Sequence, residues 1–168
     1  FANSAASCYR DSSKSTLARA GIIMYGLCPN YPIPIPDEFE PVMALKAVIS
    51  HVKTVKAGDS ISYGRTFTAD KDMRIATVTI GYADGYSRLL SSKGEILVHG
   101  KRCRIVGRIC MDQLMIDVSD AEAEAGDIVT LIGRDGNDEI TADELASLYG
   151  TIGYEVVCGI SKRVPRIF

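Results

Sequence analysis

Three short segments of this chain each place a polar or ionisable side chain beside a glycine, at the end of an apolar run. They are residues 62–64 (Ser-Tyr-Gly), 80–86 (Ile-Gly-Tyr-Ala-Asp-Gly-Tyr) and 107–113 (Gly-Arg-Ile-Cys-Met-Asp-Gln). Binding and catalytic groups concentrate on loops that a rigid scaffold holds, and glycine allows sharp turns and close approach to a ligand. We therefore interpret the three segments as one site built from separate strand ends.

The residue types in these segments limit the chemistry that is open to them. Tyr63 becomes a general base if a nearby cation lowers its pKa from about 10. A half-buried strand tyrosine is the alternative that the sequence leaves open. Tyr82 precedes an ordinary Asp-Gly turn, and Met111 also suits a gap in a core. Cys110 has no histidine near it in the sequence that would activate it as a nucleophile.

A second group of polar residues stands near the N-terminus. Arg19 precedes Gly21 in an apolar run that we expect to be a buried strand, where a guanidinium needs a carboxylate or a ligand as its partner. Backbone N–H groups near Gly21 and the hydroxyl of Ser4 are of the type that holds a phosphate. Each of these signals is weak when it is taken alone.

From residue 42 onward the sequence pattern is mostly β. Strands are expected over residues 42–56, 60–68, 74–80, 95–99, 102–106, 114–118 and 127–132. Short alternating strands separated by Gly/Asp turns fit an antiparallel barrel or sandwich. Thr141 and Glu144 have capping-box spacing, which predicts one helix that ends at Gly150.

The chain divides at a proline-rich stretch. Residues 29–36 contain four prolines, which exclude a helix or a central strand and indicate a linker. We therefore expect one region over residues 1–36 and a β domain over residues 37–168. Within the β domain, residues 56–61 and 124–129 share an Ala-Gly-Asp step and are expected to form the same turn into a strand.

Composition argues against several classes of function. The net charge is −2 and the basic residues are scattered, so neither a nucleic-acid surface nor a charged tail is expected. No apolar run approaches the ~20 residues that cross a bilayer, so we expect a soluble chain. The five cysteines lack zinc or C-x-x-C spacing and the two histidines are far apart, which indicates reduced thiols in the cytoplasm and no metal site.

Taken in this order, the segments resemble the C-terminal half of bacterial alanine racemase, a pyridoxal-phosphate enzyme. The matching pieces run in the family's order across almost the whole chain. They are residues 2–6, 19–22, 25–26, 62–64, 80–85, 107–113, 153–155 and 163–166. The resemblance implies a mostly β fold in which residues 37–168 form an antiparallel β-barrel-like domain. Residues 1–36 are then the last portion of the TIM-like (β/α)8 barrel that binds the cofactor, followed by the linker.

The resemblance also implies a role for each group of candidate residues. The cofactor phosphate is held by Ser4, by the backbone of Gly21 and Ile22, and by the hydroxyl of Tyr154. Arg19 faces the pyridine nitrogen, where its charge opposes protonation of the ring and restrains side reactions such as transamination.

The implied reaction needs two bases, because a proton leaves one face of Cα and returns on the other. The resemblance implies that one base is a lysine that also carries the cofactor. The other is Tyr63, supplied by the partner subunit of a homodimer, while Tyr82 and Met111 line the substrate side. None of the lysines here stands in a context that matches the family's lysine, so the chain alone is expected to be inactive.

The implied function is the interconversion of L-alanine and D-alanine for peptidoglycan synthesis. Two alternatives stay open. One is a serine, or alanine/serine, racemase of the glycopeptide-resistance type, against which Tyr154 speaks modestly. The other is a non-catalytic β-barrel module that binds a partner or a small ligand, and it gives no reason for Tyr63, Tyr82 and Met111 to occur together.

Overall fold

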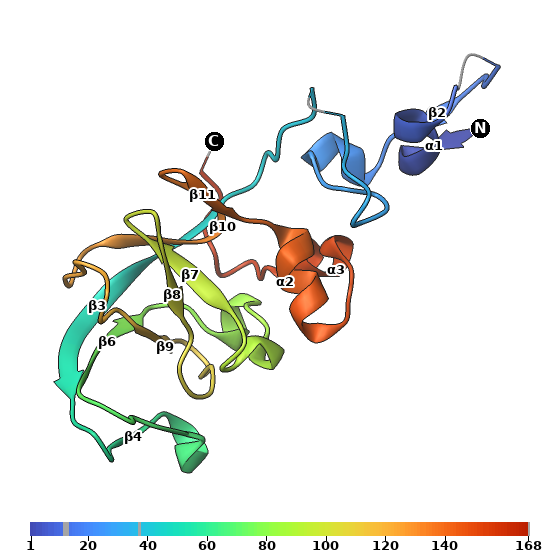
Figure 1. Cartoon of the computed structure of the whole chain (residues 1–168). Coiled ribbons are helices and arrows are strands. Elements are labelled where there is room, and N and C mark those ends of the chain that lie inside the picture. Colours follow the sequence, from blue (N-terminus) through green and yellow to red (C-terminus); the bar gives the residue numbers. More distant parts are fainter. Residues whose placement is uncertain (12–13, 37, 168) are drawn as a thin grey trace.

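The computed structural model describes residues 1–11, 14–36 and 38–167. Its N-terminal part extends away from the rest of the molecule (Figure 1) and contains four short elements. They are β1 (Ala2–Asn3), α1 (Ser4–Tyr9), β2 (Ala18–Arg19) and the 3-10 helix η1 (Ile22–Tyr25). Strands β1 and β2 are parallel, and Asn3 caps α1 by accepting a hydrogen bond from the Ala6 N–H at 2.9 Å.

The larger part of the structure is an antiparallel sheet in the order β8-β7-β10-β3-β6-β9, with β11 beside β10. Its strands are β3 (Leu45–Val55), β6 (Met73–Val78), β7 (Glu95–Val98), β8 (Lys101–Arg104), β9 (Leu114–Asp117), β10 (Ile128–Asp135) and β11 (Asp138–Ile140). Burial alternates along β9, as the sequence pattern predicts, whereas three successive residues of β7 and five of β10 are buried, so these two strands are covered on both faces.

The two edges of this sheet curve back toward each other. Just beyond β8, Ile105 forms an antiparallel bridge with Ile116 of β9, and the Val106 N–H donates to the Met115 carbonyl at 2.9 Å. A register shift between β10 and β3 marks an irregularity of the kind that bends a sheet. The prediction of a mostly β fold with an antiparallel domain is confirmed, and the meeting edges give that domain a barrel-like shape.

The strand expected over residues 60–68 is wrong as a continuous element. The structure has a small hairpin instead, in which β4 (Ser60–Ile61) and β5 (Phe67–Thr68) flank the 3-10 turn η2 (Tyr63–Arg65). Ser62 and Gly64 have φ angles of 68° and 72°, which no strand residue adopts. Tyr63 therefore stands at the tip of a hairpin.

Helices cover one end of the sheet. The 3-10 turns η3 (Tyr82–Asp84) and η4 (Arg88–Leu90) precede β7, and α2 (Ala142–Tyr149) and α3 (Gly153–Gly159) follow β11. Helix α2 confirms the capping prediction, because Thr141 accepts the Glu144 N–H at 3.0 Å and Gly150 ends the helix in the left-handed conformation. Helix α3 was not expected, since it begins and ends with glycine.

The two Ala-Gly-Asp turns have the same hydrogen-bonded structure, as the sequence predicts. The carboxylate of Asp59 accepts the Lys56 N–H at 3.1 Å, and that of Asp127 accepts the Glu124 N–H at 2.8 Å. The glycine before each aspartate has a positive φ angle, 91° in one turn and 101° in the other. Each turn leads into a paired strand, β4 or β10.

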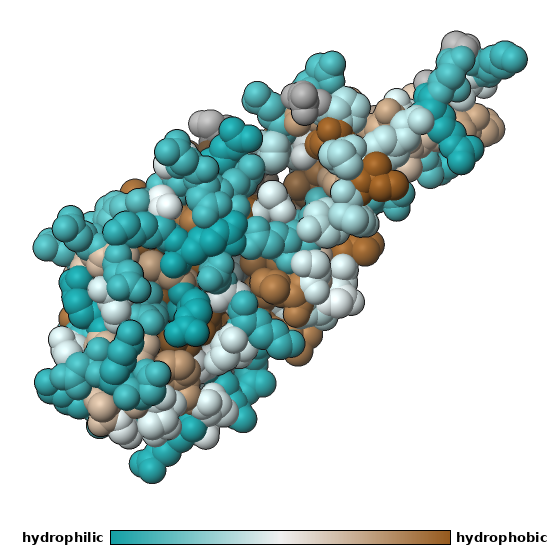
Figure 2. Space-filling view, viewed as in Figure 1, coloured by the Kyte–Doolittle hydropathy of each residue, from teal (hydrophilic) through white to brown (hydrophobic). Residues whose placement is uncertain are grey.

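In the residues that the structure describes, no helix combines the length and apolar character that a membrane crossing demands. The surface over the sheet is largely hydrophilic in the view of Figure 2. Hydrophobic residues gather in that view around the junction between the N-terminal extension and the helices α2 and α3.

Candidate functional site

The structure brings the three glycine-edged segments together. Tyr63, Tyr82 and Met111 line one pocket of about 610 Å³, although they come from a hairpin tip, a 3-10 turn and a loop before β9. Arg88, Arg108 and Asp112 also line this pocket and supply two positive charges and one negative charge. The pocket therefore combines a phenolic hydroxyl, an apolar wall and an excess of positive charge, which suits a small ligand that carries a carboxylate.

The loops of Tyr82 and Met111 are joined through their backbones. The Tyr82 N–H donates to the Cys110 carbonyl and the Ala83 N–H donates to the Met111 carbonyl, both at 3.0 Å. Gly81 makes this approach possible, because a Cβ at that position would overlap the carbonyl oxygens of Cys110 and Met111. The glycine in this segment is thus a steric requirement of the pocket.

The Tyr63 hairpin is tied to the same loop. The Ser62 hydroxyl donates to the Arg108 carbonyl at 2.6 Å. Gly107, with φ of 73°, lies where a Cβ would be 2.7 Å from the Cβ of Ser62. Tyr63 itself is 73% exposed, so its hydroxyl is available to groups from outside this chain.

The N-terminal candidates form a separate group. Asn3 pairs with Arg19 across the parallel strands β1 and β2, so Ser4 and Gly21 both follow the carboxyl ends of these strands. The Gly21 N–H donates to the Ser4 hydroxyl at 2.9 Å. Ile22 begins η1, and its N–H has no partner within that helix.

The expectation that Arg19 lies in a buried strand is wrong. Arg19 is in strand β2, but its side chain is exposed. The reason is that, among the described residues, β2 pairs only with β1 in a sheet of two strands, and both residues of β2 are exposed.

Tyr154 lies in α3, in a depression that Cys28 and Asp143 also line. Burial and the neighbouring Asp143 raise the pKa of the Tyr154 hydroxyl. Among the described residues, no hydrogen bond joins Tyr154 to Ser4, Arg19 or Gly21. The structure therefore does not bring all the predicted phosphate-binding residues into direct contact.

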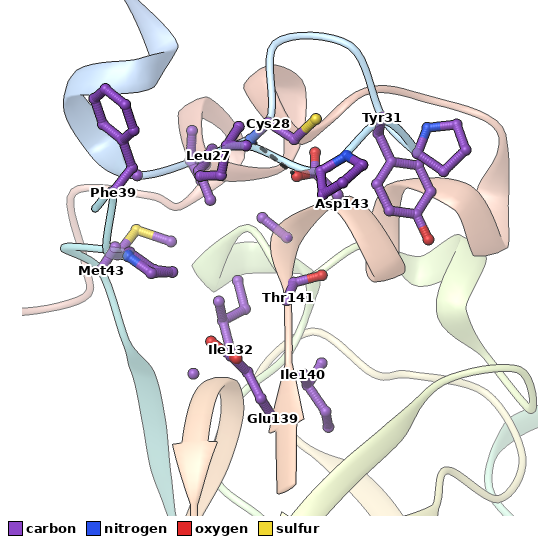
Figure 3. Close-up of a pocket in the computed structure, with 18 of the residues that line it drawn as sticks. Leu27, Cys28, Tyr31, Phe39, Met43, Ile132, Glu139, Ile140, Thr141 and Asp143 are labelled. Carbon is purple, nitrogen blue, oxygen red and sulfur yellow. Dashed lines mark hydrogen bonds between the residues drawn. The ribbon is translucent and has the colours of Figure 1, made fainter. Parts of the chain in front are cut away.

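Asp143 connects α2 to both neighbouring segments. Its Oδ2 accepts the Cys28 N–H at 3.3 Å (Figure 3), and its carboxylate also accepts the N–H of Gly153. Burial raises the pKa of Asp143. Asp143 thus links the start of the proline-rich segment to the first turn of the helix that carries Tyr154.

Figure 3 shows an apolar pocket between the proline-rich segment and the β11–α2 connection. Leu27, Tyr31, Phe39, Met43 and Ile140 are among its lining residues. Among the described residues that line this pocket, none is a predicted site residue.

The two groups of candidate residues lie far apart within the chain. In Figure 1 the hairpin that contains β4 and the N-terminal helix α1 are at opposite ends of the molecule. Tyr63 therefore cannot approach Ser4 and Gly21 of the same chain.

Several residues that line or support this site have no role in the sequence-based prediction. Arg108 stands inside one of the three segments, and Arg163 stands inside the matching piece over residues 163–166, so both carried a usable signal. Asp143 stands within the helix start that the spacing of Thr141 and Glu144 predicts, and nothing in the sequence signals its contacts with Cys28 and Gly153. Arg88 has no sequence signal, because only the fold carries it to the pocket.

Known alanine racemases match this chain along almost its whole length. The enzyme of Desulfovibrio desulfuricans is 48% identical over 99% of this chain and 44% of its own length. Alanine racemase 1 of Bacillus subtilis is 48% identical over 99% of this chain and 43% of its own length. The chain thus spans less than half of these curated relatives.

Solved structures give the same result. The crystal structure of alanine racemase from Bacillus anthracis with bound L-Ala-P matches at a TM-score of 0.92 and 47% identity, over 99% of this chain and 43% of that one. Alanine racemase from Bartonella henselae with covalently bound pyridoxal phosphate matches at a TM-score of 0.87 and 32% identity, over 99% and 45%.

A family model described as the C-terminal domain of alanine racemase matches residues 42–168, which include the hairpin, the pocket loops and the helices α2 and α3. The chain belongs to this family.

Proposed function

We propose that this chain supplies the C-terminal share of a pyridoxal-phosphate-dependent racemase that interconverts L-alanine and D-alanine. The observation that carries the proposal is the single pocket lined by Tyr63, Tyr82 and Met111. Its support is the 48% identity to proteins named alanine racemase. The division into residues 1–36 and 37–168 is part of the proposal, and a family match that starts at residue 42 supports it.

Tyr63 is the proton-transferring residue in this proposal. Its phenolate takes the proton from one face of the substrate Cα and becomes the hydroxyl, or its hydroxyl returns a proton there and becomes the phenolate; the base for the other face comes from outside this chain. Arg88 and Arg108 attract the substrate carboxylate. Tyr82 and Met111 exclude water from the reacting side of the pocket.

The N-terminal group fits pyridoxal phosphate. The Ser4 hydroxyl accepts the Gly21 N–H and so keeps its own O–H for donation to an anion. The Ile22 N–H at the start of η1, which has no hydrogen-bond partner among the described residues, is a second donor. The Tyr154 hydroxyl would add a third donor, and Arg19 would face the ring nitrogen. When bound, the cofactor supplies the electron sink that acidifies the substrate Cα.

A homodimer completes the site in this proposal. The Tyr63 hairpin and the Ser4 group lie at opposite ends of the molecule in space. Each active centre therefore takes Tyr63, Tyr82 and Met111 from one copy and the cofactor-binding group from its partner. A head-to-tail arrangement of two copies satisfies both centres at once.

We also assign the protein to the cytoplasm and its product to peptidoglycan synthesis. The cysteines support a reducing compartment, because their number is odd and all five of them are free. The serine racemase and the binding-module alternatives gain no support from relatives that are named alanine racemases.

The test uses a protein of the relatives' full length that contains this chain as its C-terminal share. We call it the extended protein. With pyridoxal phosphate bound, we expect racemisation of L-alanine, and a loss of about 10²- to 10⁴-fold in Tyr63→Phe. Tyr31→Phe, at an exposed tyrosine that does not line the pocket of Tyr63, Tyr82 and Met111, is the matched control. Full activity of Tyr63→Phe would refute the role of this residue, and absence of activity from the wild type would refute the function.

A further inference from the structure

The C-terminal segment lies directly against the Tyr82 turn. Gly85, with φ of 95°, is so close to the Gly159 carbonyl that a Cβ at position 85 would overlap its oxygen. The Ser161 N–H donates to the Asp84 carbonyl at 2.9 Å. The chain that follows α3 is thus in backbone contact with the turn that carries Tyr82.

Arg163 in this segment contacts both pocket loops. Its Nη2 donates to Asp112 Oδ1 at 2.6 Å, and its Nε lies 3.4 Å from Asp84 Oδ1. Asp112 is adjacent to Met111, and Asp84 is two residues beyond Tyr82. One guanidinium therefore bridges the carboxylates of the two loops that line the substrate side.

Asp84 is more than a surface carboxylate. Its side chain is 14% exposed, and its second oxygen accepts the Gly81 N–H at 3.0 Å. Gly81 is the residue whose missing side chain lets the two loops meet. An ion pair to Asp84 therefore acts on the junction of the loops, through a carboxylate that is largely removed from water.

The neighbours of Arg163 hold its backbone in place. Ile160 is buried on one side of it, and Val164 packs against the core on the other. Arg166 donates to the carbonyls of Ile160, Ser161 and Val164, which closes the segment into a compact turn. The guanidinium of Arg163 thus extends from a fixed base.

We propose that Arg163 is a positioning residue, which holds the Tyr82 and Met111 loops in register from outside the pocket. Without it, the carboxylates of Asp84 and Asp112 are left without their shared cation, and the two loops are joined mainly by the backbone hydrogen bonds of Tyr82 and Ala83. The consequence for substrate rests on the proposed racemase function, whereas the mechanical role does not.

Hydrogen exchange on this chain tests the mechanical role. We expect the amides of Tyr82 and Ala83 to exchange about two- to fivefold faster in Arg163→Met than in the wild type. Arg163→Lys keeps the positive charge but lacks the planar guanidinium that donates to two carboxylates, so it should give an intermediate exchange rate. The matched control is Arg134→Met, which breaks an exposed pair with Glu139 on β10 and β11, away from the pocket.

The Ile49 amide, bonded to the Asp127 carbonyl at 2.9 Å, reports global opening. The positioning role is refuted if Arg163→Met raises the exchange rates of the Tyr82, Ala83 and Ile49 amides equally. It is also refuted if Arg163→Met and Arg134→Met give the same exchange rates at all three amides. Acceleration confined to Tyr82 and Ala83 supports it. Neither result depends on catalysis.

Kinetics of the extended protein test the consequence for substrate. We expect Arg163→Met to raise the KM for L-alanine about two- to fivefold with a smaller change in kcat, and Arg163→Lys to recover part of the loss. Unchanged KM alongside faster loop exchange would refute the link to substrate. An inactive wild type would refute the proposed function and leave the exchange result standing.

Discussion

Asp143 and Gly153 pack so closely that position 153 cannot carry a side chain, because a Cβ there would overlap Asp143 Oδ1. The carboxylate accepts the Gly153 N–H and so caps α3 from another helix, since Ile152 at the cap position has no side chain that could do so. Tyr154 is the next residue. The contact therefore fixes the start of α3 and, with it, the place of Tyr154.

Gly153→Ala should push α3 away from Asp143. We expect the free energy of unfolding to fall by about 1 to 3 kcal/mol, because the added methyl overpacks a buried contact. Urea denaturation of the chain measures this loss. Gly159→Ala in the same helix is the control, since a Cβ there meets nothing nearer than 3.8 Å. Equal effects of the two substitutions would contradict the steric argument.

Asp143 should make the protein less stable as the pH rises through its titration. Burial raises the pKa of this carboxyl above its ordinary value of 3.8, so the folded chain holds the proton more tightly than the unfolded chain. Between the ordinary and the raised pKa, ionisation then costs folding free energy. We expect the stability difference between wild type and Asp143→Asn to fall with rising pH in this window and to be flat above it.

Asp138 provides a control of opposite sign. Its hydrogen bond from Arg102 lowers its pKa below 3.8, so its stabilising contribution is complete above that value and is lost as the pH falls through the lowered pKa. Urea unfolding between about pH 3 and pH 7 should give slopes of opposite sign for Asp143→Asn and Asp138→Asn. Slopes of the same sign would show that the burial of Asp143 does not govern its titration.

Tyr86→Phe should stabilise the protein. The Tyr86 hydroxyl is fully buried and has no hydrogen-bond partner among the described residues, so burial raises its pKa and the hydroxyl pays a desolvation penalty. We expect a gain of about 1 kcal/mol in the free energy of unfolding. Tyr86→Leu, which removes the ring, should instead destabilise by about 2 to 4 kcal/mol. A loss of stability in Tyr86→Phe would reveal a bond to the hydroxyl.

Gly81→Ala should open the pocket at its junction. The added Cβ would overlap two carbonyl oxygens, so the hydrogen bonds of Tyr82 and Ala83 cannot keep their present geometry. We expect a loss of about 1 to 3 kcal/mol in stability and faster exchange of these two amides. Gly159→Ala again serves as the control. Unchanged exchange at Tyr82 would contradict the role given to Gly81.

The sequence was most informative where a local pattern determines the structure. Thr141 and Gly150 mark the ends of α2 correctly, because capping depends on neighbouring residues. The paired turns at Asp59 and Asp127 follow from their own three residues for the same reason. The glycine-edged segments were also grouped correctly, since Gly81 and Gly107 stand where backbones cross.

Features that depend on distant contacts escaped prediction. Helix α3 is capped by Asp143, ten residues before Gly153, and no local signal shows this. The strand expected through Ser62 is broken by a left-handed residue that is not glycine, which propensity does not foresee. Arg19 is exposed because its sheet has only two strands here, a property of the neighbours and not of the arginine.

The distance between the Tyr63 hairpin and the Ser4 group has a genetic consequence under the proposed dimer. A copy with Tyr63→Phe and a copy with Ser4→Ala are each defective as pure dimers, because both of their centres contain the lesion. When the two copies pair, both lesions fall in one centre and the other centre is intact. Defective alleles of this protein should therefore complement one another when one substitution lies in the Tyr63 hairpin and the other lies in the Ser4 group.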